Sequence, residues 1–394
     1  MTSQLPIQQE DRTIIVDVLR GFALFGVLLG NFSSMLTNNV PQAIIDAHTT
    51  RFDQLLNELH DIFIQNKFMT LFSILFGYGF GVIMQRLEKK SINSTPFFLR
   101  RMFWLFIFGC LNLALWNGDI LHLYAVTGIF LLLFRKQSDR TVLLCSFLFL
   151  FIVPTAIRFC QHFFLGSVLT GGTLSEVYYN AYRFGSLKDI AMVNYKTYIP
   201  QWIYSWVEWR DMSETFGRFL FGYYILRRQL LTRLDENFLI IKKIWRFVLV
   251  VTLADICLVI VTDRSLISIP RYILYPFLKM GIFGTALFYA TSIVQLYKKG
   301  KLAGLMKVFR DLGRMTLTNY LVQTIIYVVI FYGLGLALLG DFSFGIIWLA
   351  SLTIYFLQGL FSKWWLSKCY YGPVEWVWRQ LTYRKRFRLI RSGQ

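Results

Sequence analysis

Long apolar stretches separated by short polar segments dominate this chain. Most stretches hold about 20 residues, which as an α-helix match the roughly 30 Å hydrocarbon core of a bilayer. The stretches lack the alternating pattern of a membrane β-barrel, and helices satisfy their own backbone groups in lipid. The sequence therefore predicts an all-α, polytopic transmembrane bundle that forms one membrane domain over 1–394. We expect about ten spans, near 14–36, 62–85, 102–117, 119–135, 141–165, 214–232, 244–262, 268–296, 315–338 and 343–366.

Two longer segments, 37–61 and 167–213, are expected as outer loops. In the first, Phe52, Leu55 and Leu59 recur at helical spacing, which predicts an amphipathic helix on the outer membrane surface or capping the bundle. The second is rich in Tyr and Trp. We favour an aromatic belt at the membrane interface for it, and a lid over an outward-facing pocket is the alternative.

Charge fixes the expected orientation. The chain carries 41 Lys and Arg against 22 Asp and Glu, a formal net charge of +19. Most of the basic residues lie in alternate connecting segments and in the tail 367–394, so both termini are expected in the cytoplasm. Membrane lipids are the expected partners of the basic tail. Because the charge is spread over membrane-flanking segments, we do not expect a nucleic acid as a partner. The sequence leaves the oligomeric state open.

The first expected span carries three polar residues on one helical face, Asp17, Arg20 and Asn31. Asp17 and Arg20 are three residues apart and can form an ion pair. One interpretation is an architectural clamp with an interhelical Asn31 hydrogen bond. The other places Arg20 near the cytoplasmic end, where it binds a phosphate or carboxylate, and Asn31 near an outer reaction centre.

Other polar residues gather near the expected outer ends of spans. In the segment WNGDILHLY, Asp119 is placed to cap a helix and His122 follows three residues later. This is either a structural cap or an Asp–His pair in which Asp119 orients His122 as a general base. Lys67 either extends to the lipid headgroups or faces a pocket. His60 lies in the outer amphipathic helix, exposed or swung over the pocket mouth.

The later spans hold further intramembrane polar residues. Asn319 and Gln323 share a face of the ninth span, where we favour interhelical hydrogen bonds over the lining of a cytoplasmic vestibule. Asp255 and Lys279 lie on neighbouring spans, and the sequence leaves open whether they pair. The five cysteines show no paired spacing, so neither a disulfide framework nor a metal site is expected.

Several blocks resemble those of a known family. RTIIVDVLRGFALFGVLLGN, KFMTLFSILFGYGF, NGDILHLYAVTG, GYYILRR, GRMTLTNYLVQ and GPVEWVWR look like the signature blocks of the YeiB-like bacterial membrane proteins. They occur in that family's order over essentially the whole chain. The resemblance implies a multi-pass protein of the bacterial cytoplasmic membrane.

The first block is also similar to the wider transmembrane acyltransferase superfamily, which includes the acyltransferase-3 O-acetylases and the lysosomal heparan glucosaminide acetyltransferase. Those enzymes take acyl groups from cytoplasmic acyl-CoA and deliver them to acceptors across the membrane. By resemblance, Arg20 matches the superfamily's first-span arginine. Asn31 stands where the acyltransferase-3 enzymes have a histidine and the heparan enzyme has an asparagine. The heparan enzyme uses a histidine of the following loop, where this chain has His48 and His60.

The resemblance ranks acyl transfer first among the functions. Acyl-CoA, as the possible donor, would enter near Arg20, Asn319 and Gln323, and an envelope glycan or lipid acceptor would approach near the outer residues. His122 or His60 would take the acceptor proton, with no metal involved. The alternative is a transporter or permease for a small anionic solute or lipid, in which the same charges line a pathway. A third hypothesis is a non-catalytic membrane partner or sensor.

Overall fold

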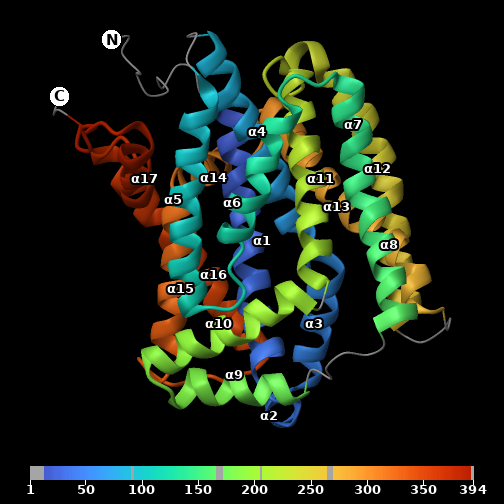
Figure 1. Ribbon diagram of the computed structural model, residues 1–394, viewed down its shortest axis with the longest axis vertical. Helices are drawn as coiled ribbons and strands as arrows, with labels where there is room; N and C mark the ends of the chain where they lie inside the picture. The colour runs from blue at the N-terminus through green and yellow to red at the C-terminus, as the bar shows by residue number, and fades with distance from the viewer. Residues whose placement is uncertain (1–12, 90–92, 166–171, 205, 264–268, 392–394) are drawn as a thin grey trace.

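The computed structural model describes residues 13–89, 93–165, 172–204, 206–263 and 269–391 (Figure 1). Within these ranges helices account for nearly all regular structure, apart from one isolated bridge between Cys369 and Ile390. The predicted all-α fold is therefore confirmed. The helices are α1 Ile14–Asn39, α2 Gln42–His48, α3 Arg51–Phe63, α4 Lys67–Lys89, α5 Ser94–Leu115, α6 Leu121–Phe130, α7 Asp139–Phe147, α8 Val153–Cys160, α9 Gly172–Phe184, α10 Leu187–Tyr204, α11 Val207–Arg227, α12 Leu234–Asp263, α13 Arg271–Lys298, α14 Ala303–Arg314, α15 Thr316–Phe331, α16 Phe344–Lys368 and α17 Pro373–Tyr383.

Seven helical segments of the described chain are long and apolar enough to cross a membrane. The count rises to eight if α14 and α15, which meet at an angle of 82°, form one broken span. Apart from this pair, which includes the predicted span 315–338, two predicted spans do not meet the criterion. The segment 119–135 contains only the short apolar helix Leu121–Phe134, and 214–232 overlaps the more polar α11. The chain is therefore a multi-pass membrane protein. The exact number of ten spans remains a prediction.

Helix α1 lies at the centre of the bundle, packed against α4, α14, α15 and α16 (Figure 1). The α6–α7 and α11–α12 connections and helix α17 lie at one end, and α2, α9 and α10 lie across the other (Figure 1). The basic residues of those connections therefore gather at the end that carries α17, as the inside-positive pattern predicts.

The segments expected to be loops contain helices. The 37–61 segment forms α2 and α3, and the predicted amphipathic helix is confirmed as α3, whose Phe52 and Leu55 are 63% and 50% exposed. Asp53 of α3 accepts a hydrogen bond of 2.7 Å from the Gly345 amide, which joins α3 to the start of α16. The connection 297–314, between the predicted spans 268–296 and 315–338, also contains a helix, α14, whose apolar side packs on α1.

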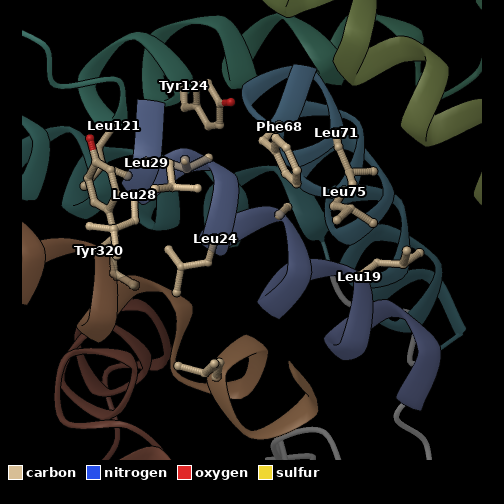
Figure 2. Close-up of a cluster of buried hydrophobic side chains, with 14 of the residues drawn as sticks. Leu19, Leu24, Leu28, Leu29, Phe68, Leu71, Leu75, Leu121, Tyr124 and Tyr320 are labelled. Carbon is tan, nitrogen blue, oxygen red and sulfur yellow. The ribbon is translucent and has the colours of Figure 1, made fainter. Parts of the chain in front are cut away.

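Glycine permits close contacts between the backbones of neighbouring helices, as two examples show. A Cβ on Gly21 of α1 would lie 1.9 Å from the Phe309 carbonyl oxygen of α14. A Cβ on Gly222 of α11 would lie 1.8 Å from the Ile74 carbonyl oxygen of α4. Any larger residue would push these helices apart. Between α1, α4 and α6 the core is filled by leucine and aromatic side chains, including Leu24 (Figure 2).

We expect Gly222→Ala to lower the thermal midpoint in detergent, because the added methyl meets a backbone carbonyl that side-chain rotation cannot move. Overpacking of this kind typically costs about 1–3 kcal/mol. Gly304→Ala is the matched control, since nothing lies within 4 Å of its added Cβ. Equal thermal midpoints for the two variants would contradict the close α4–α11 contact.

Candidate functional site

A partly open cavity of about 260 Å³ lies among α1, α4, α5, α15 and α17. We call it the arginine-lined cavity. Its cationic residues are Arg20, Arg86, Arg101, Arg314 and Arg379. Asp17 and Glu375 are the acidic residues in its wall, so positive charge is in excess.

The arginine-lined cavity is elongated along α4. Its wall runs from Arg86, in the last turn of α4, back to Phe72, fourteen residues earlier. Fourteen residues of α-helix span about 21 Å. The deep end is apolar and aromatic, with Leu121, Tyr124 and Tyr320 in its wall. The cavity therefore joins a cationic end to an apolar end inside the bundle.

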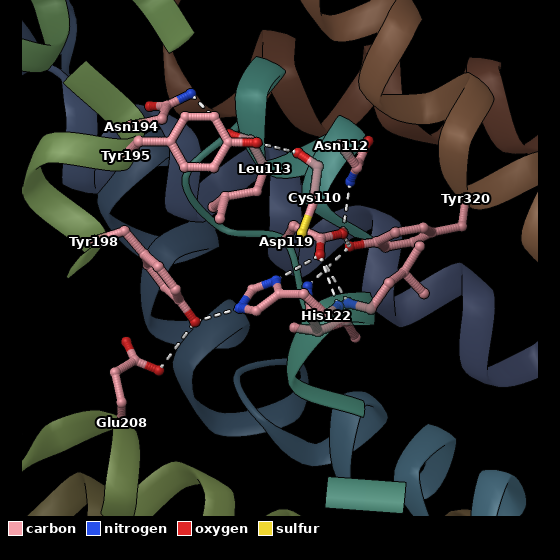
Figure 3. A network of polar contacts seen from close by, with 12 residues as sticks. Cys110, Asn112, Leu113, Asp119, His122, Asn194, Tyr195, Tyr198, Glu208 and Tyr320 are labelled. Atoms are coloured by element: carbon pink, nitrogen blue, oxygen red, sulfur yellow. Dashed lines mark hydrogen bonds and ion pairs between the residues drawn. The ribbon is translucent and has the colours of Figure 1, made fainter. Parts of the chain in front are cut away.

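A buried carboxylate lies directly beyond Tyr320 (Figure 3). Asp119 Oδ1 accepts from Asn112 Nδ2 at 2.8 Å and from the Tyr320 hydroxyl at 3.4 Å. Its Oδ2 accepts from the Leu121 and His122 amides at 2.9 and 3.2 Å and lies 2.8 Å from His122 Nδ1. The predicted cap and the predicted Asp–His pair are thus both present.

This arrangement fixes the tautomer of His122. The side-chain nitrogen of Asn112 and two backbone N–H groups donate to Asp119, so both of its oxygens act as acceptors, as in a carboxylate. Its charge favours a proton on His122 Nδ1, which leaves Nε2 directed at the Tyr198 hydroxyl, with which it forms a short hydrogen bond. Asp119 and His122 are only 5% and 4% exposed. The pair has the geometry of an oriented general base.

Helix α10 covers this pair. The Tyr195 hydroxyl donates to the Cys110 carbonyl oxygen at 2.7 Å, and Asn194 Nδ2 donates to the Leu113 carbonyl oxygen at 3.0 Å (Figure 3). These inward-facing residues fit the lid interpretation of the 167–213 segment. Trp206 and Trp209 are exposed, as the belt interpretation expects.

Glu208, in the first turn of α11, extends the network. The Tyr198 hydroxyl lies 3.5 Å from Glu208 Oε2. Glu208 precedes the predicted span 214–232. Burial, with a smaller contribution from the negative charge of Asp211, raises the pKa of Glu208 to about 7. Sequence reasoning missed Tyr198 and Glu208, because no local spacing links them to His122.

Comparison with known proteins supports a family. Residues 225–385 match the family described as "Protein of unknown function (DUF418)". The chain is 32% identical over 400 residues to "Uncharacterized protein YxaH" of Bacillus subtilis (strain 168), covering 97% of each chain. It belongs to this YeiB-like family. "Uncharacterized protein YeiB" of Escherichia coli (strain K12) is 28% identical over 417 residues, covering 95% of this chain and 97% of that one. No solved structure matches.

The matched DUF418 region of this YeiB-like protein contains only part of the candidate site. It includes Tyr320 and Glu375, whereas Asp119 and His122 precede it. Glu375 accepts from the Leu317 and Thr318 amides at 2.7 and 3.0 Å and thereby caps α15, the helix that carries Tyr320. The DUF418 region thus supplies one wall of the cavity and the tyrosine that contacts Asp119.

The three polar residues predicted on one face of the first span do not share one site in this YeiB-like protein. Arg20 Nη1 pairs with Asp17 Oδ1 at 3.2 Å, as predicted, and both line the arginine-lined cavity. Asn31 lies half-buried further along α1 and lines neither the cavity nor the Asp119 network.

Lys67 and His60 form a separate group with the α3–α4 connection. Lys67 is buried, and its Nζ donates to the Asp61 carbonyl oxygen at 2.7 Å. His60 Nδ1 lies 3.2 Å from Asp61 Oδ1, and its ring packs against Phe344 and Trp348 of α16. The structure thus brings His60 to α16, and its partners differ from those of His122. His48 is exposed on α2.

Asn319 and Gln323 face α16 rather than the cavity. Gln323 Nε2 donates to Gln358 Oε1 at 2.8 Å, and Asn319 Nδ2 donates to Ser362 Oγ at 3.1 Å. Neither residue lines the arginine-lined cavity. Their contacts match the interhelical hydrogen bonds that the sequence favoured.

The intramembrane charges on α12 and α13 have different partners. Lys279 Nζ pairs with Glu214 Oε1 of α11 at 2.8 Å, and Asp255 Oδ2 accepts from Thr285 Oγ1 at 3.3 Å. Arg218 also pairs with Glu214, at 2.7 Å. The open question of an Asp255–Lys279 pair is thus resolved in favour of Glu214. Among the described residues, no group of three or more His, Cys, Asp or Glu is arranged to hold a metal ion.

Glu208 predicts a pH effect on stability. Its pKa rises from 4.5 to about 7 in the folded protein, so the folded state binds this proton more tightly than the unfolded chain. The resulting stabilisation is complete below pH 4.5 and is lost as the pH rises through 7. We expect Glu208→Gln to raise the thermal midpoint at pH 8 more than at pH 5, relative to the unmodified protein. An equal change at both pH values would contradict the buried acid.

Proposed function

We propose that this YeiB-like protein transfers an acyl group from cytoplasmic acyl-CoA to an acceptor on the other side of the membrane. One observation carries the proposal. The arginine-lined cavity ends at Tyr320, and the hydroxyl of the same residue lies 3.4 Å from Asp119 Oδ1 of the Asp119–His122 pair. A cationic binding space and an oriented base thus lie on either side of one side chain.

The two ends of the cavity suit the two ends of an acyl-CoA molecule. The phosphates of CoA are anionic, and the planar guanidinium group binds phosphate through paired hydrogen bonds. The apolar end suits the pantetheine arm and the acyl group. Arg20, which matches the superfamily's first-span arginine, lines this cavity. The donor would therefore enter at the basic end of the bundle, which we assign to the cytoplasm.

The chemistry follows from the tautomer of His122. An acceptor hydroxyl gives its proton to His122 Nε2, in the position that the Tyr198 hydroxyl occupies here. Its oxygen forms a bond to the thioester carbon, the carbon–sulfur bond breaks, and CoA thiolate leaves towards the cytoplasm, where it takes a proton from water. Asp119 holds the ring and stabilises the imidazolium that forms. We assign the acceptor to the envelope glycans or lipids and the protein to the bacterial cytoplasmic membrane.

Five residues named from the sequence drop out of this mechanism. Two of them, Asn319 and Gln323, bond to α16 and do not line the cavity. His60 and Lys67 interact with the α3–α4 connection, and Asn31 lines neither the cavity nor the network. His122 is therefore our single candidate base.

One observation favours the alternative of a transporter or permease for a small anionic solute or lipid. The α14–α15 pair is bent by 82°, and Gly313, Arg314 and Thr316 on either side of the bend line the arginine-lined cavity. Transporters often place the ends of broken helices at the substrate site. In that case the same cavity would hold the solute, and Tyr320 would close its inner end.

We expect acetyl-CoA to raise the thermal midpoint of the purified protein, because a ligand that binds only the folded state stabilises it. Arg86→Gln should reduce this shift, since it removes a cation from the cavity wall. Arg228→Gln, whose side chain is 58% exposed outside the cavity, should keep it. His122→Gln should keep the shift and lose release of free CoA by at least about 100-fold, the usual contribution of a general base.

Two results would contradict acyl transfer. One is the absence of any thermal shift at saturating acetyl-CoA and longer-chain acyl-CoA. The other is CoA release by His122→Gln that equals the unmodified protein. Flux of an anionic solute into protein-containing liposomes, absent from empty ones, would support the transporter instead.

A further inference from the structure

The Tyr198 hydroxyl lies between two groups that can each bind a proton, an imidazole and a carboxyl group. On one side it forms a short hydrogen bond with His122 Nε2, and on the other it lies 3.5 Å from Glu208 Oε2 (Figure 3). These side chains come from α6, α10 and α11, so the arrangement depends on the packing of three helices. The general-base mechanism uses His122 and leaves Glu208 without a role.

Two arrangements of the hydrogen atoms fit the contacts of this chain. The Asp119 carboxyl group keeps a hydrogen on His122 Nδ1, and the Tyr198 hydroxyl has a single hydrogen. In the first arrangement, Tyr198 donates to neutral His122, and protonated Glu208 donates to the Tyr198 oxygen. In the second, protonated His122 donates to the Tyr198 oxygen, and Tyr198 donates to ionised Glu208. The two arrangements contain the same number of protons.

We propose that His122, Tyr198 and Glu208 form a proton relay that leads from the buried Asp119–His122 pair to the outer edge of the bundle. A proton taken up by His122 passes to the Tyr198 oxygen as the tyrosine hydrogen passes to Glu208. Tyr198 ends as a neutral hydroxyl, His122 returns to the neutral base, and Glu208 releases the proton to solvent. No redox change or additional reactant is needed.

The surroundings of Glu208 suit a proton acceptor. Glu208 is half-buried, while Trp206 and Trp209 beside it are exposed. The neighbouring Arg210 forms an ion pair with Asp211 at 3.0 Å. Burial and the negative charge of Asp211 favour the protonated form of Glu208, whereas His122 and Arg210 favour the ionised form.

Further charges lie deeper in the protein. Lys279 of α13 pairs with Glu214 at 2.8 Å, and Arg218 pairs with the same carboxylate at 2.7 Å. Tyr275 of α13 also donates to Glu214, and the Arg210 guanidinium lies 5.8 Å from the Tyr275 ring centroid. These ion pairs and hydrogen bonds centre on Glu214, and none of them includes His122, Tyr198 or Glu208.

The relay uses the same histidine as the proposed acyl transfer and does not depend on an acyl donor. It would serve an acyltransferase by removing the acceptor proton to the outside after the product leaves and the Tyr198 hydroxyl again contacts His122 Nε2. It would serve a transporter as a proton path. A test on the protein alone therefore separates the relay from both functions.

The test is a pH titration in detergent with two probes. Isotope-edited infrared spectroscopy follows the carboxyl band that Glu208→Gln removes, and ¹⁵N NMR of labelled histidine follows the ring signal that His122→Gln removes. The chain has only four histidines, so the assignment is direct. Groups that share a proton titrate in two common steps, separated by more than about one pH unit when the coupling is strong.

We expect both probes to show the same two steps in the unmodified protein. Tyr198→Phe should reduce each probe to one independent step. Tyr195→Phe is the matched control, because it removes a hydroxyl of α10 that binds the Cys110 carbonyl instead, and it should keep both steps. Should Tyr198→Phe fail to fold, Glu208→Gln and His122→Gln should each leave the remaining probe with a single step.

Independent single steps in the unmodified protein would overturn the relay, as would two common steps that survive in Tyr198→Phe. Both results are read without acyl-CoA or solute, so they leave the tests of acyl transfer and transport unaffected.

Discussion

The charge of Asp119 is the constraint on which the centre of this protein depends. A carboxylate buried at this depth costs several kcal/mol unless hydrogen bonds replace its water. Here the donors come from Asn112 on α5, the backbone at the start of α6 and Tyr320 on α15. The hydrogen bonds to this one carboxylate therefore fix three helices relative to one another. They also hold the His122 ring in one tautomer.

Tyr320 lies between the cavity and the buried Asp119–His122 pair. On one side lies the arginine-lined cavity, and on the other lies the Asp119–His122 pair beneath α10. Close helix packing also holds His122 in place, since a Cβ on Gly109 of α5 would lie 2.2 Å from the His122 amide nitrogen. The backbones of α5 and α6 are in contact there, which leaves the histidine little freedom to shift. Our proposals of group transfer and of transport both rest on this wall shared by a cationic space and a buried histidine.

The sequence predicted what local spacing determines and missed what packing determines. Asp17 with Arg20 and Asp119 with His122 are each three residues apart at a helix start, so their pairing follows from helix geometry. The Tyr198 partner of His122 is 76 residues away along the chain, and the Tyr320 partner of Asp119 is 201 residues away.

Without knowledge of the fold, no pattern singles out these tyrosines among the 21 in the chain. The polar face of α15 was predicted, whereas its partner α16 and the 82° bend before it depend on tertiary contacts.

In our proposal the arginine-lined cavity and the α10 lid open to opposite sides of the membrane. Cysteine labelling with a membrane-impermeant maleimide tests it directly, using Val82→Cys in the cavity wall and Ile199→Cys on α10 in a background without native cysteines. The account predicts that Val82→Cys reacts only from the cytoplasmic side and Ile199→Cys only from outside. Reaction of both from the same side would contradict it.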